Sequence, residues 1–393
     1  MGTLVGFDAL VSQAVGANDQ RDVRRALQRG LLLATLLCVP LGLILWPTAP
    51  VLYAMQQQPD IVPMATRVVH ISMLGLPGMM AFVVLRQTLQ AMERLRPILV
   101  AVLLANVINA ACNWLLIDGH LGAPALGVNG SALASVIGRT ALPLLVLWSA
   151  RDVLWPLLRE RDPSLFALAP LARMLRIGAP VGVQYLLEVG VFNAVALLMG
   201  AQATSTLAAH QVAINLASFT FMMPLGIGAA AAVLVGQAIG RGDAAGARRA
   251  AIAAITAGLC VSTLTSVIFL TIPRLLASGY VAEPGVIALA ATLIPLAGVF
   301  QLFDGLQAVA GGALRGAADT RAAMLANILG FWAVGLPIGL YLAYRSDMGP
   351  AGLWWGLVIG LAAVAAVLLV RLYQRFGGPL VRVRVDAPAG GTN

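Results

Sequence analysis

The sequence predicts an all-α, polytopic membrane protein built from two related bundles of helices. Of its 393 residues, 60% are hydrophobic and only 10% are charged, which is far more apolar surface than a soluble core of this size needs. The apolar residues form successive long runs, and the basic residues gather in every second connection between these runs. No connection is long enough to fold as a separate soluble domain.

The apolar runs have the length of transmembrane helices, which need about 20 residues to cross a bilayer. We expect ten complete spans, at residues 30–54, 65–89, 97–117, 127–150, 177–199, 210–235, 249–272, 286–313, 323–344 and 351–373.

The basic residues predict the orientation of these spans. All 25 are arginine, and they gather in the connections at 21–29, 94–96, 151–176, 241–249, 315–321 and 371–384. The connections between hold only Arg67, Arg274 and Arg345. The positive-inside rule places the arginine-rich side in the cytoplasm, so we expect an inner-membrane protein with both ends of this chain cytoplasmic. This alternation explains the net charge of +9 without a nucleic-acid partner.

An internal repeat relates the two halves of the chain. Residues 10–16 (LVSQAVG) resemble residues 234–240 (LVGQAIG), and the likeness continues to Asp19 and Asp243. An even number of spans separates the copies, so the halves share one orientation, related by an axis along the membrane normal. We expect an N-terminal bundle over residues 1–160 and a C-terminal bundle with a short cytoplasmic tail over residues 161–393.

The repeat also predicts a shortened first bundle. The second half opens with residues 173–224, whose counterparts in the first half would precede Met1. We therefore expect that this chain lacks the first helix, and most of the second, of a twelve-span plan.

Two acidic residues lie in the middle of predicted spans. Glu188 has Gln184 one turn before it, and Asp304 has Gln301 and Gln307 three residues to either side. An ionised group inside the hydrocarbon is costly, so a mid-span acid is by default a candidate ion or proton site. The alternative is a protonated acid that hydrogen-bonds to its neighbours. We expect Glu188 and Asp304 to bind the coupling cation or the substrate, and the three glutamines to line the same cavity.

Two asparagines are weaker candidates for a cavity. Asn109 and Asn113 are four residues apart and share a helix face. Amide side chains also hydrogen-bond between membrane helices, so a structural role explains them equally well.

No motif indicates an enzyme or a bound cofactor. The three cysteines, Cys38, Cys112 and Cys260, have no metal-ligand spacing, and the catalytic motifs HExxH and GxSxG are absent. Apart from Na⁺ held by Glu188 or Asp304, we expect no metal.

Several segments along the chain resemble the multidrug and toxic compound extrusion (MATE) family, in its bacterial multidrug branch. They include residues 6–17 (GFDALVSQAVGA), 109–114 (NAACNW), 208–211 (AAHQ) and 300–307 (FQLFDGLQ). In that family, acids matching Glu188 and Asp304 are implicated in cation coupling or substrate binding. The pair matching Asn109 and Asn113 helps line a cation site in the first bundle.

The resemblance and the buried acids together predict a secondary antiporter. It would export small organic, cationic drugs or metabolites in exchange for H⁺ or Na⁺ by alternating access, as a monomer embedded in membrane lipid. One alternative is a flippase for a lipid-linked precursor, which should carry more basic residues in its cavity than Arg86 and Arg139, the two arginines within spans. Another is an inactive, truncated paralogue.

Overall fold

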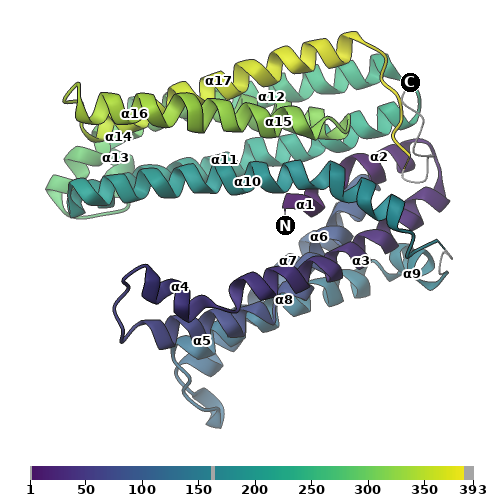
Figure 1. The fold of residues 1–393 in the computed structure, drawn as a ribbon, viewed down its shortest axis with the longest axis horizontal. Helices are drawn as coiled ribbons and strands as arrows, with labels where there is room; N and C mark the ends of the chain where they lie inside the picture. Colours follow the sequence, from purple (N-terminus) through teal and green to yellow (C-terminus); the bar gives the residue numbers. More distant parts are fainter. Residues whose placement is uncertain (1, 161–163, 385–393) are drawn as a thin grey trace.

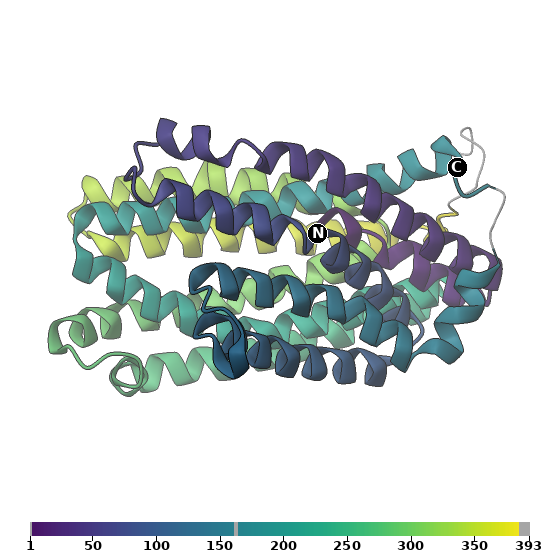
Figure 2. The ribbon, with the colours of Figure 1, turned by 90° about the horizontal axis from the view of Figure 1, so that it is seen from below.

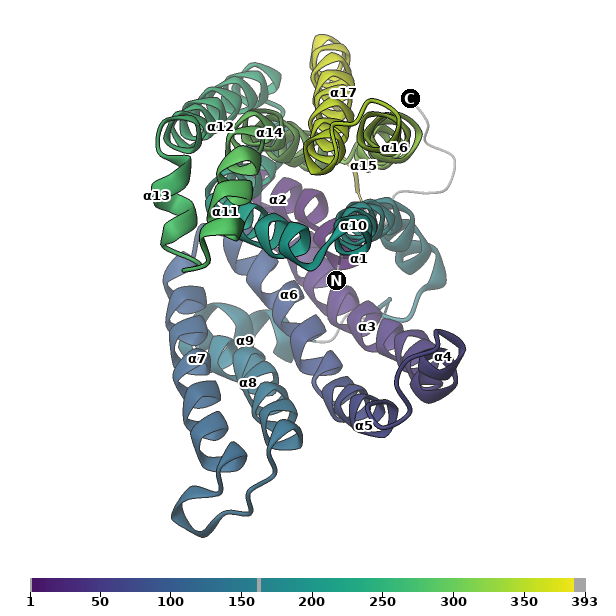
Figure 3. The ribbon, with the colours of Figure 1, turned by 90° about the vertical axis from the view of Figure 1, so that its left-hand side faces the viewer.

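The computed structural model describes residues 2–160 and 164–384, and within them it contains helices and no strand. The helices form two groups that meet at one end of the molecule and separate toward the other (Figure 1). The long helices of both groups run along the same axis (Figure 2). Viewed end on, the groups are distinct, with α1 and α2 between them (Figure 3).

The first group has its own hydrophobic core, which extends into the first turns of α10. Its helices are α1 (Gly2–Val5), α2 (Asp8–Gly16), α3 (Gln20–Leu45), α4 (Thr48–Ala54), α5 (Val62–Met73), α6 (Leu76–Ala91), α7 (Leu95–Ile117), the 3₁₀ turn η1 (His120–Gly122), α8 (Val128–Ser149) and α9 (Arg151–Arg159).

The second group is built around another core, formed by residues from 191 to 376. Its helices are α10 (Leu168–Gln202), α11 (Thr204–Gly240), α12 (Ala244–Thr271), α13 (Pro273–Ser278), α14 (Pro284–Gly316), α15 (Thr320–Asn327), the π-helical segment η2 (Ile328–Gly335), α16 (Leu336–Tyr344) and α17 (Pro350–Gly377). The expected boundary at residues 160 and 161 lies at the edge of a gap in the described chain. Residues 385–393 of the expected tail lie outside it.

The polytopic helical fold predicted from the sequence is confirmed. In the described part of the chain, 9 helices are long and apolar enough to cross a membrane, or up to 10 if the bent pair α5 and α6 is one span. That pair bends by 43° around residues 74 and 75. The expected first span, 30–54, is wrong in its bounds, because α3 begins at Gln20 and ends at Leu45, and Pro47 precedes the separate helix α4.

The internal repeat in the sequence includes a turn of similar shape before α3 and before α12. Asn18 and Gly242 have positive φ angles of 54° and 75°, and each is followed by an aspartate that caps the next helix. Asp19 Oδ1 accepts the N–H of Asp22 at 3.1 Å, and Asp243 Oδ1 accepts the N–H of Gly246 at 2.7 Å. Each cap satisfies an N–H that the first turn of a helix leaves unpaired.

The two groups meet through the repeated segments themselves. A Cβ atom added to Gly16 would lie 2.1 Å from the carbonyl oxygen of Gln237, and one added to Gly240 would lie 2.1 Å from that of Gln13. Glycine therefore allows α2 and α11 to touch backbone to backbone. Gln13 Nε2 donates to the carbonyl of Gly316 in the second group, and Gln237 Nε2 donates to the carbonyl of Ala91 in the first, each at 2.9 Å.

Candidate functional site

The two predicted mid-span acids lie in the wall of one cavity. Glu188 projects from the middle of α10 and Asp304 from the middle of α14, and both line a cavity of about 210 Å³ in the second group. Next to Asp304, a Cβ atom on Gly305 would come within 1.9 Å of Ser262 Oγ, so the glycine brings α12 and α14 close together. Asp304 is 6% exposed.

The charges of the two acids act on each other. Asp304 lies close enough to Glu188 for two negative charges to repel. The Gln307 side chain and the Arg315 guanidinium both stabilise the negative charge of the Glu188 carboxylate. Such a pair favours states in which a positive charge is shared between the two carboxylates, whether a proton or a cation.

Arg315 lies deeper than the sequence indicated. We expected it in an arginine-rich connection, but it belongs to the last turn of α14 and is 6% exposed. Its charge acts on Glu188 in the second group and on Asp8 in the first. Arg315 therefore lies between the acid-lined cavity and the junction of the two groups.

The three predicted glutamines are buried on the same helices but are not in the cavity wall. Gln184, Gln301 and Gln307 are at most 5% exposed, and the Oε1 atom of each has no hydrogen-bond partner among the residues that the structure describes. Gln301 Nε2 donates to Ala217 O and Thr220 Oγ1 of α11, both at 2.6 Å. Carboxylate and amide oxygens are the ligands that hard cations prefer.

Aromatic residues complete the wall of the cavity, and sequence reasoning missed them. Phe192 and Phe300 stand edge to face, with ring centroids 5.9 Å apart, and Phe221 and Asn193 also line the space. Phe192 follows Glu188 by one helical turn and Phe300 precedes Asp304 by one turn. The (i, i+4) spacing from each acid was the signal that could have found them.

The asparagine pair lies elsewhere, in the first group of helices. Asn109 lines a separate cavity of about 290 Å³ together with Asn106, Ser135 and Arg139. Asn113 donates its amide to the carbonyl and to Oδ1 of Asn109, at 2.9 and 3.1 Å, and does not line the cavity. No acidic side chain lines this cavity among the described residues.

A family model described as MatE matches residues 1–115 and 180–341, which is most of the chain. The chain belongs to the MATE family. Members of this family are transporters rather than enzymes, in agreement with the missing catalytic motifs.

Relatives of this MATE chain extend over nearly its whole length. It is 36% identical to "Probable multidrug resistance protein NorM" of Mesorhizobium japonicum, over 95% of this chain and 82% of the relative. It is 35% identical to "Multidrug resistance protein NorM" of Burkholderia vietnamiensis, with the same two coverages, 95% and 82%.

Solved structures of MATE transporters share the fold. The eukaryotic transporter AtDTX14 superposes with a TM-score of 0.85 at 21% identity, covering 96% of this chain and 85% of that one. A MATE transporter in an outward-facing conformation superposes with a TM-score of 0.84 at 18% identity, covering 96% and 84%.

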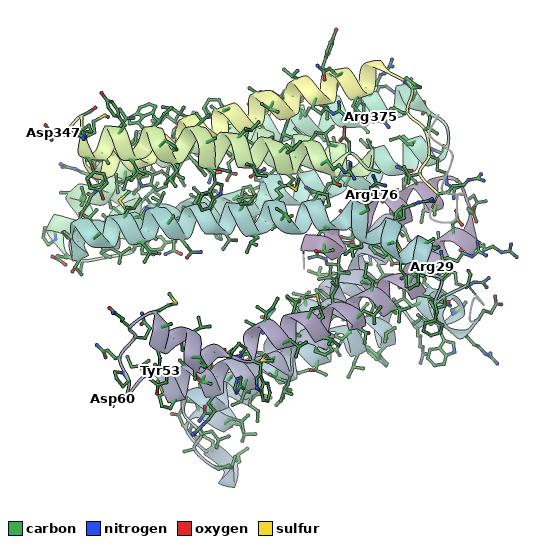
Figure 4. All side chains as sticks on the ribbon, in the orientation of Figure 1. Arg29, Tyr53, Asp60, Arg176, Asp347 and Arg375 are labelled. Atoms are coloured by element: carbon green, nitrogen blue, oxygen red, sulfur yellow. The ribbon has the colours of Figure 1, made fainter. Side chains whose placement is uncertain are left out.

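The end at which the two halves of this MATE protein meet is the arginine-rich end. Arg29, Arg176 and Arg375 lie there, while Tyr53, Asp60 and Asp347 lie at the end where the halves separate (Figure 4). The tail after α17 crosses the junction, because the N–H of Val383 donates to Gln13 Oε1 at 2.7 Å.

Proposed function

We propose that this protein is a multidrug efflux antiporter that exports small organic cations in exchange for H⁺ or Na⁺. The single observation that carries the proposal is the pair of acids, Glu188 and Asp304, in the wall of one cavity within a membrane-spanning bundle. The relatives named as multidrug resistance proteins support the class of substrate.

The acid pair supplies the competition on which exchange depends. Two carboxylates that repel each other favour one bound positive charge, and a proton, Na⁺ and an organic cation all provide it. The substrate and the coupling ion therefore displace each other. The phenylalanine rings in the cavity wall favour an organic cation further, because aromatic faces attract positive charge.

The two bundles, residues 1–160 and 161–393, would be the bodies that move during alternating access. Since arginine-rich ends lie in the cytoplasm, the junction at Gln13 and Gln237 would close the cytoplasmic side of a monomer in the inner membrane. The arrangement in Figure 1 would then open outward, with both ends of this chain in the cytoplasm.

The flippase alternative requires basic groups in the cavity. No basic side chain lines the acid-lined cavity among the described residues, and Arg139 lies in the other cavity. A negatively charged lipid-linked substrate is therefore disfavoured where the two acids lie.

The test is transport by the purified chain in liposomes. Movement of ethidium is followed under an imposed Na⁺ gradient, an imposed pH gradient and no gradient, for the wild-type protein and Asp304→Asn. We expect gradient-driven transport in the wild type, and a loss of at least about tenfold in the variant, because a neutral amide cannot bind or release the coupling charge.

The matched control is Asp347→Asn, which removes an exposed acid at the separated end of the molecule and should leave transport unchanged. The arm with the active gradient identifies the ion. Equal coupled transport by Asp304→Asn and the wild type would contradict the proposed role of Asp304. A wild-type chain that transports nothing under either gradient would favour the inactive paralogue.

A further inference from the structure

A groove on the outside of the second bundle combines positive charge with apolar surface. It has a volume of about 620 Å³ and lies between the start of α15 and the last turns of α17, at the arginine-rich end of the molecule. Its polar residues are Asp319, Arg321, Arg371 and Gln374. The groove is separate from both inner cavities, and transport as proposed above makes no use of it.

Along the helix axes, the charged side chains lie at one end of the groove and the exposed aliphatic side chains lie at the other. Leu325 lies one turn into α15 from Arg321, and Val367 lies one turn before Arg371 in α17. Leu325, Val367 and Val370 line the groove and are 52%, 44% and 57% exposed. By the usual distribution of residues in membrane proteins, we expect these exposed aliphatic side chains to face the lipid chains and the arginines to lie level with the lipid headgroups.

The carboxylate in the groove already has a partner. Arg371 Nε donates to Asp319 Oδ2 at 2.7 Å, which uses one of the five N–H groups of the guanidinium. Arg321 is exposed and has no hydrogen bond or ion pair with the residues that the structure describes. Positive charge therefore exceeds negative charge in the groove.

The absence of a helix cap distinguishes Asp319 from its two counterparts. Asp19 and Asp243 follow turns of the same shape and cap the next helix with their carboxylates. Asp319 follows the same kind of turn, at Ala318 with a φ of 59°, but its side chain makes no cap on α15. The N–H groups in the first turn of α15 therefore donate no hydrogen bond to the Asp319 side chain.

We propose that this groove binds one anionic glycerophospholipid from the leaflet on the arginine-rich side. The phosphate lies between Arg321 and Arg371, and an acyl chain follows Leu325, Val367 and Val370. Basic pockets between membrane helices on the cytoplasmic side are typical sites for acidic headgroups. A zwitterionic lipid gains less here, because its cationic group would need an acid and Asp319 is engaged by Arg371.

The test counts bound lipids by native mass spectrometry of the whole purified chain in detergent. Phosphatidylglycerol and phosphatidylcholine with identical acyl chains are titrated against the wild type, Arg321→Gln and the control Arg249→Gln. Arg249 is an exposed arginine at the same end, outside the groove, with 75% of its side chain exposed. We expect roughly fivefold weaker binding of the first phosphatidylglycerol to Arg321→Gln, and no change for Arg249→Gln.

Further measurements test whether the groove binds a whole lipid rather than a free headgroup, and whether a variant loses binding because it is misfolded. Arg321→Gln keeps the bond between Arg371 and Asp319, and Val367→Trp fills the apolar part of the groove without changing charge. Both variants should weaken the binding of the first phosphatidylglycerol. Excess glycerol phosphate should not displace this lipid. Equal binding of the two lipids to the wild type, or unchanged phosphatidylglycerol binding in both variants, would overturn the proposal. Displacement by glycerol phosphate would instead indicate a site for a free phosphate.

Discussion

The two halves of the molecule share one backbone plan but differ in the chemistry of their cavities. At the junction the plan is nearly symmetric, because Gln13 and Gln237 each donate to a carbonyl of the opposite half at 2.9 Å. The cavities are not symmetric. The second half carries Glu188 and Asp304 among phenylalanines, whereas the first carries Asn109, Arg139 and no lining acid in the part of the chain described.

This difference shows that the two halves can keep a similar backbone arrangement while their ionisable side chains differ. The backbone contacts depend on glycine and glutamine at repeated positions, and both halves have kept them. A carboxylate in hydrocarbon is costly wherever it is placed, and the second half places two of them in one cavity wall. The C-terminal cavity should therefore carry the exchange of charge.

The largest effect is expected when one residue in each of the two cavities is substituted and the coupled transport rates are compared. Glu188→Gln removes a carboxylate that faces Asp304, and coupled transport should fall by at least about tenfold, since the pair can no longer hold and release one charge. Asn109→Ala removes an amide from the other cavity and should lower the same rate by less than about threefold. Rates in liposomes under the active gradient measure both.

Each of these variants needs the same check on folding, for which the elution profile in detergent suffices. If Asn109→Ala lowered coupled transport as strongly as Glu188→Gln, the asymmetry between the cavities would not be functional. The first half would then take part in coupling as well.

Most of the fold could be predicted from the sequence, because a bilayer allows few solutions. Apolar runs of sufficient length must become helices, and the positions of the arginine-rich connections predict their direction. The interruption after Leu45 and the bend between Met73 and Leu76 were harder to predict, because proline and glycine are tolerated inside membrane helices as well as at their ends.

The site was predictable only where its residues contrast with their surroundings. Glu188 and Asp304 are conspicuous in apolar runs, but Phe192 and Phe300 look like any other lipid-facing or core residue there. Arg315 was misread for the opposite reason, since an arginine at the end of a span usually reaches the membrane surface. Only the packing of α14 reveals that this one is buried.

An intermediate effect is expected at the junction, where the two halves are most alike. Gly240→Ala places a methyl group 2.1 Å from the carbonyl oxygen of Gln13, so the junction must shift, at a cost of about 1–3 kcal/mol. Gly226 lies in the same helix with nothing within 4 Å of its added Cβ, so Gly226→Ala is the matched control. Thermal unfolding in detergent should show a lower midpoint for the first variant alone.

The spacing between the halves gives a second measure of the same substitution. Spin labels at the arginine-rich end should report a longer distance across the junction in Gly240→Ala than in the wild type or in Gly226→Ala. Identical distances and midpoints in both variants would mean that the contact between α2 and α11 tolerates the extra methyl group, and that it does not hold the halves together.

The smallest effect is expected from the ion pairs of the two repeated aspartates, Asp19 and Asp243. Burial alone would raise the pKa of Asp19, but the N–H of Asp22 and the guanidinium of Arg382 together hold that pKa below its usual value. Arg382 lies 3.2 Å from Asp19 and 2.7 Å from Asp22. Among the residues that the structure describes, Asp243 forms an ion pair with the exposed Arg249 alone, at 3.8 Å.

The sign of the pH dependence follows from the lowered pKa. A group with a depressed pKa in the folded state stabilises the protein above its unfolded pKa, about 3.9 for aspartate, and loses that contribution as the pH falls through the folded value. Since a third of the Asp19 side chain is exposed, solvent screening limits the pair to less than about 1 kcal/mol. Arg382→Gln should therefore lower the unfolding midpoint at pH 7, and this effect should disappear as the pH falls through the lowered pKa of Asp19. Arg249→Gln should be near neutral across the same range, and a pH-independent loss in Arg382→Gln would assign its effect to packing of the tail rather than to charge.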